Sequence, residues 1–527
     1  MTNSIPDIEE SDCILITGSN TTEAHPLVAS RVFKAKERGA KVIVIEPRQI
    51  QMAYHADLYL RQRPGTDVAW INGMMNIIIA NGWENKEFIA SRTEGFEALR
   101  DKVKEYPPEK VEQITGISKE DLAKAAEMYA KSGKSAILYC MGITQHISGV
   151  DNVLSCANLA MLTGNIGRRG TGVNPLRGQN NVQGACDMGG LPNVFTGYQN
   201  VTDETARMKF EDSWGVKIQP QNGITLMEMM HGADEGKIKG MFILGENPML
   251  SDPDIKHVKE ALGKLEFLVV QEIFPSSTTA LAHVILPGAS WAEKDGTFTN
   301  TDRHVQLIRK AIEPPGEARP DWQIIRDIGK KMSAKGFDFN SPEEIFNEMA
   351  KLTPIYAGIS YSRLSKNGGL QWPCRTPEDP GTEVLHTSSF SRGKGLFTAI
   401  DFREPAELPD KDYPLTLTTG RSIFHYHTGT VTRNSPTLES ELHEAYLEVN
   451  PEDAGNLGVT EDEMVKVTSR RGEIRIKVRT TDRVGKGIVF MPFHFAEAAA
   501  NALTNTALDP VAKIPEYKVC AVRVEKA

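Results

Sequence analysis

Polar and glycine residues stand where predicted strands of this sequence give way to loops. In parallel α/β sheets, ligands bind at the carboxyl ends of the strands, where helix N-termini and glycine backbones can approach phosphate groups. Acidic side chains there, such as Glu46 and Asp67, suit sugar hydroxyls or the edge of a guanine base. The first candidates for a binding site are therefore Gly18, Asn20, Glu46, Pro47, Arg48, Gly65, Asp67, Met141, Gly142, Gly245, Asn247 and Gln271.

These residues also have a simpler interpretation, because Gly, Asn and Asp are the ordinary turn residues of any α/β protein. For any one of these loops taken alone, the simpler interpretation is the better one. No Gly-x-Gly-x-x-Gly motif is present, so the sequence does not support a dinucleotide-binding fingerprint of the NAD type.

A second candidate is the segment 163–189, which is rich in Gly, Asn and Gln and contains almost no core-forming side chains. Long irregular segments inside compact domains are usually functional. The amide side chains of this segment and Arg177 would supply hydrogen-bond donors to an anionic cofactor or substrate. A flexible linker is the alternative, although linkers rarely combine an Asn-Asn pair, glutamines and a Cys-Asp pair.

The elements that must position these residues alternate between strand and helix in the first third of the chain. Short apolar runs at Cys13–Thr17 and Lys41–Ile45 predict two strands, and Pro26–Arg38 between them predicts a helix. Two apolar strands joined by a helix form a right-handed βαβ unit on a parallel sheet. Further strands are expected at Ser135–Tyr139, Gly240–Leu244 and Leu265–Val270.

From about residue 405 the pattern changes to short β-rich runs, among them Met464–Thr468 and Glu473–Val478, which predict a β-barrel. The expected fold class is a multi-domain α/β protein with parallel-sheet αβα domains and a C-terminal β-barrel. The predicted domains are an αβα domain 1–179, a second αβα domain 180–345 with an inserted segment around 292–320, an irregular connector 346–404 and a barrel 405–527.

Composition argues against several classes of protein. The 527 residues carry a formal net charge of −9 and a sequence pI near 5.8, which argue against a nucleic-acid partner. No apolar run approaches the roughly 18–20 residues of a membrane span, and the first residues have neither the basic nor the apolar region of a secretory leader. We therefore expect a cytoplasmic protein without direct membrane insertion.

Six cysteines are scattered along the chain without a Cys-x-x-Cys pair. A disulfide framework is implausible in so long and cysteine-poor a chain. A zinc or iron–sulfur site needs clustered thiolates, and the sequence contains no such cluster. Most of these cysteines are expected to be small buried side chains, and no metal ligand is predicted.

The segment Leu176–Gly189 closely resembles the arginine-bearing loop of the molybdopterin-dependent formate dehydrogenases, a family of the DMSO reductase superfamily. Met141–His146 and Leu162–Gly167 resemble the family's approach to that loop. The loop around Arg177 is the most specific of these motifs, since the related nitrate reductases typically carry a shorter loop there. The resemblance extends over essentially the whole chain.

Two further motifs resemble the superfamily as a whole. One combines Ala282–Pro287 with Trp291–Asn300. The other combines Thr419–Arg421 with His425–Thr430, and it is similar to the cofactor-contacting turn that opens the C-terminal barrel of these enzymes.

The resemblance implies a cofactor and a reaction. In the family, two molybdopterin guanine dinucleotides hold one molybdenum or tungsten atom, at which formate is oxidised to carbon dioxide in a two-electron step, or formed in the reverse direction. Arg177 would orient formate as a catalytic residue. The electrons would pass to an electron-transfer subunit with iron–sulfur or flavin centres.

The resemblance also implies the cofactor contacts. His425 and His427 have an alternative interpretation as histidines of the barrel core, because single histidines are often structural. One dinucleotide would lie mainly against Gly18, Asn20, Glu46, Gly65 and Asp67. The other would lie against Gly245, Asn247, Thr419, Arg421, His425, Asn501 and Lys518. The remaining implied contacts are Pro47, Arg48, Met141, Gly142, Gln145, Gln179, Gln271, Asp302 and His427.

In the family, the iron–sulfur cysteines, the selenocysteine or cysteine that ligates the metal, and the adjacent histidine precede the position that Met1 matches. We therefore expect this chain to lack the cluster and the metal ligand and to be inactive alone. A selenocysteine codon read as a stop would explain this, as would a split or an inactive subunit. The alternative functions are another molybdopterin oxidoreductase, of the nitrate reductase type, and a non-catalytic scaffold of the same fold.

Overall fold

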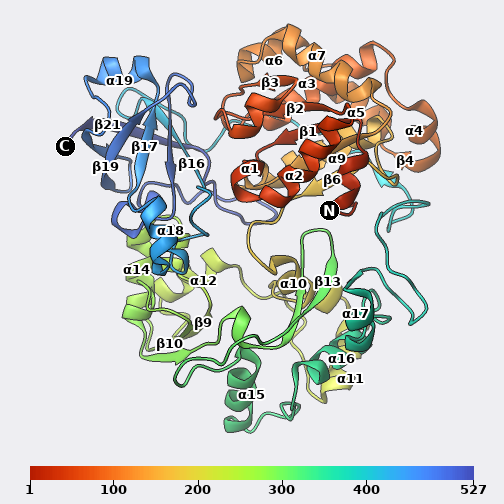
Figure 1. Cartoon of the computed structure of the whole chain (residues 1–527), viewed down its shortest axis with the longest axis vertical. Coiled ribbons are helices and arrows are strands. Elements are labelled where there is room, and N and C mark those ends of the chain that lie inside the picture. The colour runs from red at the N-terminus through yellow and green to blue at the C-terminus, as the bar shows by residue number, and fades with distance from the viewer. The chain divides into compact units, whose positions relative to one another are not determined.

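The computed structural model describes all residues from Met1 to Ala527, and it divides into two compact units. Unit 1 comprises residues 1–178, 250–256 and 384–527, and unit 2 comprises residues 179–249 and 257–383. Figure 1 labels the helices and strands of both units. None of the helices combines the length and the apolar character needed to cross a membrane.

A five-stranded parallel sheet forms the centre of the N-terminal part of unit 1, with the strand order β3-β2-β1-β5-β6. Strands β1, β2 and β5 have the bounds that the sequence predicts, because each is a short apolar run closed by a turn residue. The strands are β1 (Cys13–Thr17), β2 (Lys41–Ile45), β3 (Leu58–Leu60), β5 (Ser135–Tyr139) and β6 (Gly172–Pro175).

Both faces of this sheet are buried, as expected for parallel strands. Leu15 and Ile43 face a core that includes residues of α3, α7 and α9, while Ile14 and Val42 face a second core that includes residues of α2. The helices of this part are α1 (Thr21–Ala24), α2 (Pro26–Glu37), α3 (Asp67–Ala80), α4 (Lys86–Arg92), α5 (Phe96–Val103), α6 (Pro108–Thr115), α7 (Lys119–Lys131), α8 (Met141–Thr144) and α9 (Gly149–Leu162); the short strands β4 (Thr93–Glu94) and β15 (Gly395–Leu396) pair beside them.

The C-terminal part of unit 1 is a closed barrel with the strand order β16-β20-β17-β19-β18-β21. Alternation along β19 places Ile474, Ile476 and Val478 in the barrel core. The predicted C-terminal barrel is therefore confirmed. Its elements are β16 (Leu415–Gly420), α18 (Pro436–Glu441), β17 (Tyr446–Val449), α19 (Pro451–Leu457), β18 (Met464–Thr468), β19 (Glu473–Thr480), β20 (Ile488–Pro492) and β21 (Cys520–Lys526).

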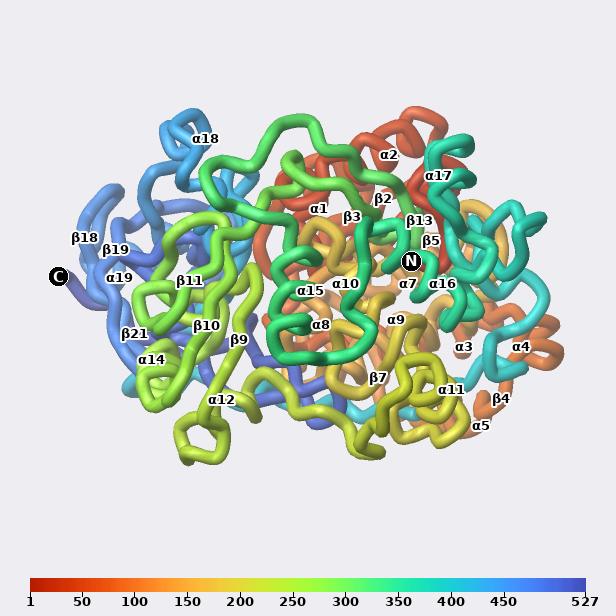
Figure 2. The backbone as a smooth tube through the Cα atoms, turned by 90° about the horizontal axis from the view of Figure 1, so that it is seen from below, coloured from red at the N-terminus to blue at the C-terminus, as the bar shows by residue number.

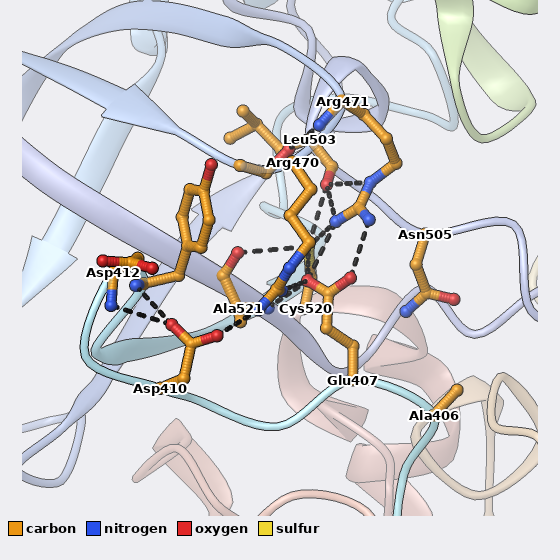
Figure 3. Close-up of polar contacts among 12 residues, drawn as sticks. Ala406, Glu407, Asp410, Asp412, Arg470, Arg471, Leu503, Asn505, Cys520 and Ala521 are labelled. Atoms are coloured by element: carbon orange, nitrogen blue, oxygen red, sulfur yellow. Dashed lines mark hydrogen bonds and ion pairs between the residues drawn. The ribbon is translucent and has the colours of Figure 1, made fainter.

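An ion-pair network joins the barrel to the segment that leads into it (Figure 3). The Glu407 carboxylate accepts hydrogen bonds from both terminal nitrogens of Arg471, at 2.7 and 2.9 Å, and from the Ala521 amide at 2.7 Å. Arg471 also donates to the Leu503 carbonyl, which accepts a further bond from Cys520 Sγ. The network thereby connects the β18–β19 turn, strand β21 and the residues before the barrel.

Unit 2 contains a three-stranded parallel sheet with the order β11-β10-β9, whose strands run side by side in Figure 2. Its buried face carries Ile243, Leu268 and Val270. On the opposite face, Phe242 is 45% exposed and Phe267 is 51% exposed. The strands are β9 (Gly240–Leu244), which has its predicted bounds, β10 (Phe267–Glu272), which begins and ends two residues later than predicted, and β11 (Val284–Pro287).

The predicted irregular connector, 346–404, contains regular structure. Within it, the hydroxyl of Ser360 caps α17 (Tyr361–Asn367) by accepting a hydrogen bond from the Arg363 amide, and the helix buries Leu364. The Gly, Ser and Thr content of the segment concealed these local signals. Residues up to Glu383 belong to unit 2, and those that follow belong to unit 1.

The remaining elements lie mostly in unit 2, and the predicted insertion around 292–320 contains the antiparallel pair β12–β13. They are α10 (Val182–Asp187), β7 (Val194–Phe195), β8 (Gln199–Asn200), α11 (Glu204–Trp214), α12 (Leu226–Asp234), α13 (Pro248–Ser251), α14 (Ile255–Gly263), β12 (Gly296–Thr299), β13 (His304–Ile308), α15 (Asp321–Lys331), α16 (Pro342–Leu352), α17 (Tyr361–Asn367) and β14 (Leu370–Gln371).

Candidate functional site

One pocket in unit 1 brings together many of the residues that the sequence singled out. It encloses about 840 Å³, part of it open to solvent. Strand ends of the five-stranded sheet form one side, and residues of the barrel form the other. The predicted residues that line it are Gly18, Asn20, Glu46, Pro47, Arg48, Gly65, Asp67, Met141, Gly142, Thr419, Arg421 and Lys518.

Two strand ends cross at the pocket with no side chain between them. Gly18 follows β1 with a left-handed φ of +57°, and Gly142 follows β5. The Gly142 amide donates to the Gly18 carbonyl at 2.9 Å, and a Cβ added to Gly142 would lie 2.4 Å from Gly18 Cα. Only glycine fits this crossing, so the two backbones approach each other directly at the edge of the pocket.

Residues of the barrel complete the pocket. Thr419, near the end of β16, donates its hydroxyl to the Tyr517 carbonyl at 2.9 Å. Lys518 Nζ donates to the Thr419 carbonyl at 2.8 Å. These two bonds hold the end of β16 against the turn that precedes β21. Arg421 follows β16 and lines the same pocket. Thr419, Arg421 and Lys518 therefore share one pocket with Gly18 and Asp67, whereas the resemblance divides these residues between two dinucleotides.

The pocket holds opposite charges at close quarters. Burial, with the nearby charge of Asp67, raises the pKa of Glu46 to about 7. Burial also raises the pKa of Asp67 to about 6, although a hydrogen bond from Trp70 opposes this. Burial and the charge of Arg421 lower the pKa of Lys518 to about 8. Burial in the pocket thus disfavours charge on Glu46, on Asp67 and on Lys518.

Arg48 forms part of the pocket wall. Its guanidinium makes a two-point ion pair with the buried Glu448 carboxylate, at 2.6 and 2.7 Å, and stacks 4.0 Å from the centre of the Phe490 ring. A guanidinium that makes such a two-point ion pair has its charge compensated by a protein carboxylate. The structure therefore gives Arg48 a role in joining β2 to the barrel.

Four buried polar atoms of the lining have no hydrogen-bond partner in the protein, namely Asn20 Nδ2, Glu46 Oε2, Gln62 Oε1 and His146 Nδ1. Each such atom costs about 1–3 kcal/mol while it stays unpaired. The lining therefore fits a ligand that carries both hydrogen-bond donors and acceptors, as the base, sugar and phosphates of a nucleotide do.

The predicted site residues did not include Gln62 or His146, although His146 closes the motif Met141–His146. Gln62 follows β3 in an Arg-Gln-Arg-Pro turn. His146 follows Gln145, a predicted site residue that does not line the pocket. A search of every strand end for polar side chains would have found Gln62. The other lining residues outside the prediction are Ser19, Ala24, Ile50, Pro64, Cys140, Thr418, Gly420, Phe490 and Phe493.

Other predicted residues of unit 1 lie outside this lining. The Arg177 carbonyl accepts a hydrogen bond from His25 Nε2 at 2.7 Å, and Asn501 Nδ2 donates to the carbonyls of Leu250 and Ser251. A Cβ on Gly178, the residue after Arg177, would lie 2.0 Å from a terminal nitrogen of Arg421. The residue that follows Arg177 therefore lies directly against a residue of the pocket.

The two predicted histidines lie in the turn after β16. Both ring nitrogens of His425 have protein partners, the Leu442 carbonyl at 2.6 Å and the Thr432 hydroxyl at 3.2 Å, and its ring packs edge-on against Phe495. This is the geometry of the alternative interpretation, a structural histidine. The His427 carbonyl accepts a hydrogen bond from the ring of His494.

The predicted residues of unit 2 make contacts within that unit. Asn247 Oδ1 accepts a hydrogen bond from the Thr278 hydroxyl at 2.7 Å, and Gln271 Nε2 donates to Asp321 at 2.7 Å. Gly245 donates its amide to the Gln271 carbonyl. The Asp302 carbonyl accepts a bond from Gln371, and the Gln179 carbonyl accepts one from the Val182 amide.

All six cysteines are free thiols, and Cys13, Cys156, Cys374 and Cys520 are buried. No group of three or more His, Cys, Asp or Glu side chains has the arrangement of a metal site.

A parallel α/β sheet whose strand ends share a polar pocket with a barrel defines a cofactor-binding α/β protein. A family model described as molybdopterin oxidoreductase matches residues 1–331, and one described as molydopterin dinucleotide binding domain matches residues 415–521. The chain therefore belongs to the molybdopterin oxidoreductase family, and a molybdopterin cofactor is implied. The pocket fits such a group, because its lining leaves buried donors and acceptors for a ligand.

Named relatives match the whole chain. It is 55% identical to the F420-dependent formate dehydrogenase subunit alpha of Methanocaldococcus jannaschii, over 100% of this chain and 78% of that protein. It is 41% identical to formate dehydrogenase H of Escherichia coli, over 100% of this chain and 74% of that protein. The resemblance to this family is thus confirmed.

A solved structure supports the fold class. Acetylene hydratase from Pelobacter acetylenicus matches with a TM-score of 0.78 at 19% identity, over 99% of this chain and 81% of that one. The predicted α/β fold with parallel sheets and a C-terminal barrel is confirmed.

Proposed function

We propose that this chain is the catalytic subunit of a formate dehydrogenase, which interconverts formate and carbon dioxide. The observation that carries the proposal is the position of the arginine-bearing loop. Gly178 packs against Arg421, a residue of the pocket, so the loop that begins at Arg177 lies beside the implied cofactor site. Similarity to formate dehydrogenases over the whole chain supports the same reaction.

The cofactor that we propose is a molybdenum or tungsten atom held by two molybdopterin guanine dinucleotides, which would supply the two-electron acceptor. The cationic side chains of Arg421 and Lys518, which line the pocket, suit its phosphates. The side chains of Glu46 and Asp67 suit sugar hydroxyls or N–H groups of a base.

Arg177 would orient formate. Formate is a small carboxylate without an apolar part, so its binding energy must be largely electrostatic. A guanidinium presents a planar fork that matches a carboxylate at two points, and carbon dioxide, which has no charge, would leave this fork easily. The bond from His25 to the Arg177 carbonyl fixes the backbone from which this partly buried side chain extends.

We further infer that electrons pass to a partner subunit with iron–sulfur or flavin centres. The relative from Methanocaldococcus jannaschii supports this, because it is an alpha subunit and therefore one of several subunits of its enzyme.

The test is Arg177→Lys in the assembled, cofactor-bearing enzyme. Truncating one partner of a buried charge pair costs about 2–5 kcal/mol, so kcat/KM for formate should fall roughly 30-fold or more and KM should rise. Pterin and metal content should stay normal. Arg169→Lys is the matched control, since the Arg169 side chain is 52% exposed and pairs with Asp7. Loss of pterin with unchanged formate KM would make Arg177 a cofactor ligand instead.

A further inference from the structure

Helix α10 of unit 2 is held by polar contacts and not by an apolar core. The helix, Val182–Asp187, closes the loop that starts at Arg177, and its buried residues are Gln183, Gly184 and Asp187. None of these three has an apolar side chain. Apolar burial is non-directional, whereas a hydrogen bond fixes both a distance and an angle. The position of α10 therefore depends on the partners of its polar side chains.

The carboxylate of Asp187 makes most of these contacts. It is fully buried and accepts four hydrogen bonds. Its Oδ1 accepts from Gln183 Nε2 at 2.8 Å and from the Tyr198 hydroxyl at 2.7 Å. Its Oδ2 accepts from the Tyr356 hydroxyl at 2.5 Å and from Trp372 Nε1 at 2.8 Å. Each carboxylate oxygen is thus paired twice, and three of the four donors lie outside the helix.

The surroundings of Asp187 support its charge and keep its donors protonated. Arg303 is 2% exposed, and its guanidinium lies 5.6 Å from the centre of the Trp372 ring. Burial lowers the pKa of Arg303 to about 10, while the charges of Asp302 and Asp187 oppose this shift. Burial, together with the charge of Asp187, raises the pKa of Tyr356. Tyr356 therefore keeps its proton and donates to Asp187 throughout the neutral pH range.

A second contact fixes the start of the helix. Asn181 precedes α10 with a left-handed φ of +58°, and its Oδ1 accepts a hydrogen bond from the Thr299 amide of β12 at 2.9 Å. A Cβ added to Gly184 would lie 2.1 Å from the same oxygen, so the Asn181 side chain folds against the helix. Any sliding or rotation of α10 would break bonds at both of its ends.

Arg177 is joined to this helix by a short link. Only Gly178, Gln179 and Asn180 separate it from Asn181. On the other side of the link, the Arg177 carbonyl accepts the hydrogen bond from His25 at 2.7 Å. A displacement of α10 has few backbone dihedrals over which it can be absorbed, so it moves the backbone that carries the Arg177 side chain.

We propose that Asp187 is a positioning residue for Arg177, because it fixes α10 and thereby the direction from which the guanidinium meets formate. The inference rests on the proposed function, in which Arg177 orients formate. A two-point contact between a guanidinium and a carboxylate is planar and depends on accurate placement. A displacement of about 1 Å at such a group can lower the rate on the order of 100-fold.

The test is a double-mutant cycle of Asp187→Asn and Arg177→Lys in the assembled, cofactor-bearing enzyme. The amide nitrogen that Asp187→Asn introduces cannot accept, so one pair of donors loses its acceptor. Alone, this variant should lower kcat/KM for formate roughly 10- to 100-fold. In the Arg177→Lys background the same change should lower kcat/KM by under about threefold, because a lysine has no planar fork to misplace.

Tyr356→Phe is a milder variant, which keeps the test decisive if Asp187→Asn does not fold. It removes one donor and leaves three, so kcat/KM should fall in the same direction by about two- to tenfold. Tyr361→Phe is the matched control, because Tyr361 packs on Phe346 as Tyr356 does but is not one of the donors to Asp187. Hydrogen exchange of the amides of residues 178–189 should rise in Tyr356→Phe and stay normal in the control.

Thermal melting and pterin content check that each variant is folded and loaded. An equal fall of kcat/KM in both backgrounds overturns the inference, since Asp187 would then act on the fold and not through Arg177. Normal kcat/KM in a Tyr356→Phe enzyme with raised amide exchange overturns it too. The proposed function fails by a different result, normal formate kinetics in Arg177→Lys alone, which the cycle records separately and which would remove both proposals.

Discussion

The two parallel sheets of this molecule follow the same sequence pattern but differ in what surrounds them. In unit 1, all residues of β1 are buried, and its strand end opens into the polar pocket. In unit 2, strand β9 exposes Phe242 and Leu244 to 45% and 43%. The polar groups that follow its strand ends bond to the protein, as Asn247 does to Thr278.

The difference teaches that a turn at a strand end becomes a ligand site only when another element closes over it. In unit 1, Lys518 and Thr419 of the barrel face the turns after β1, β2 and β5. In those turns, the side chains of Asn20 and Glu46 each have a buried polar atom without a protein partner, which a ligand could pair. In unit 2, Asn247 pairs with Thr278 and Gln271 donates to Asp321, and of these strand-end side chains Gln271 keeps one unpaired atom, Oε1.

The largest effect should come from breaking the ion pair that joins the barrel of unit 1 to the segment before it. Glu407→Ala leaves Arg471, which is 15% exposed, without its carboxylate, and removal of one partner of a buried pair costs about 3–5 kcal/mol. Thermal and urea melts would measure the loss. The control is Glu266→Ala in unit 2. Glu266 pairs with Lys239 at 2.7 Å, but the two side chains are 66% and 68% exposed. Loss of this pair should lower the free energy of unfolding by under about 1 kcal/mol.

The same pair should give an acid-side pH dependence. Burial tends to raise the pKa of Glu407, but the hydrogen bonds from Arg471 and the Ala521 amide outweigh it and hold the pKa below 4.5. The contribution to stability is therefore present above the pKa of the unfolded chain and is lost as pH falls through the lower folded value. A Glu407→Ala variant that melts like wild type at neutral pH would contradict this assignment.

A second prediction concerns the crossing of the two strand ends. Gly142→Ala places a methyl group 2.4 Å from Gly18 Cα, so the loops must separate, at about 1–3 kcal/mol or more. Most bound pterin should be lost, as measured by fluorescence of the released pterin. Gly240→Ala is the matched control in β9, since its Cβ would meet only the Phe267 carbonyl, at 3.6 Å. Normal pterin content in Gly142→Ala would show that the crossing does not shape the site.

Several strands could be predicted from local sequence, whereas the composition of the pocket could not. Runs such as Cys13–Thr17 and Met464–Thr468 carry their own signals, because apolar residues and turn formers bound them directly. The ion pair between Arg48 and Glu448 joins residues 400 positions apart, which no local pattern encodes. Gln62 and His146 escaped notice for the same reason, since their importance depends on what the barrel covers.

A third prediction uses the unpaired acid of the pocket. Burial raises the folded pKa of Glu46 to about 7 from an ordinary 4.5, so the protonated form favours folding. Stability of the cofactor-free chain should therefore fall as pH rises from about 4.5 to 7, by on the order of 1–2 kcal/mol after allowance for partial exposure. Glu46→Gln should flatten this slope in thermal melts between pH 5 and 8. An equally steep slope in the variant would assign the effect to Asp67.

The smallest effect on the free energy of unfolding is expected on the exposed face of the unit 2 sheet. This prediction tests most directly the difference in burial between the two parallel sheets. Phe242 is 45% exposed, so Phe242→Ser removes little buried surface and should change the free energy of unfolding by less than about 1 kcal/mol. Ile43→Ala in β2, where the side chain is fully buried, should cost about 2–5 kcal/mol, because it leaves a cavity between packed layers. Urea denaturation of both variants gives the two values. A cost for Phe242→Ser as large as that of Ile43→Ala would mean that this face is covered in the working protein, and the two sheets would then differ in their partners rather than in their burial.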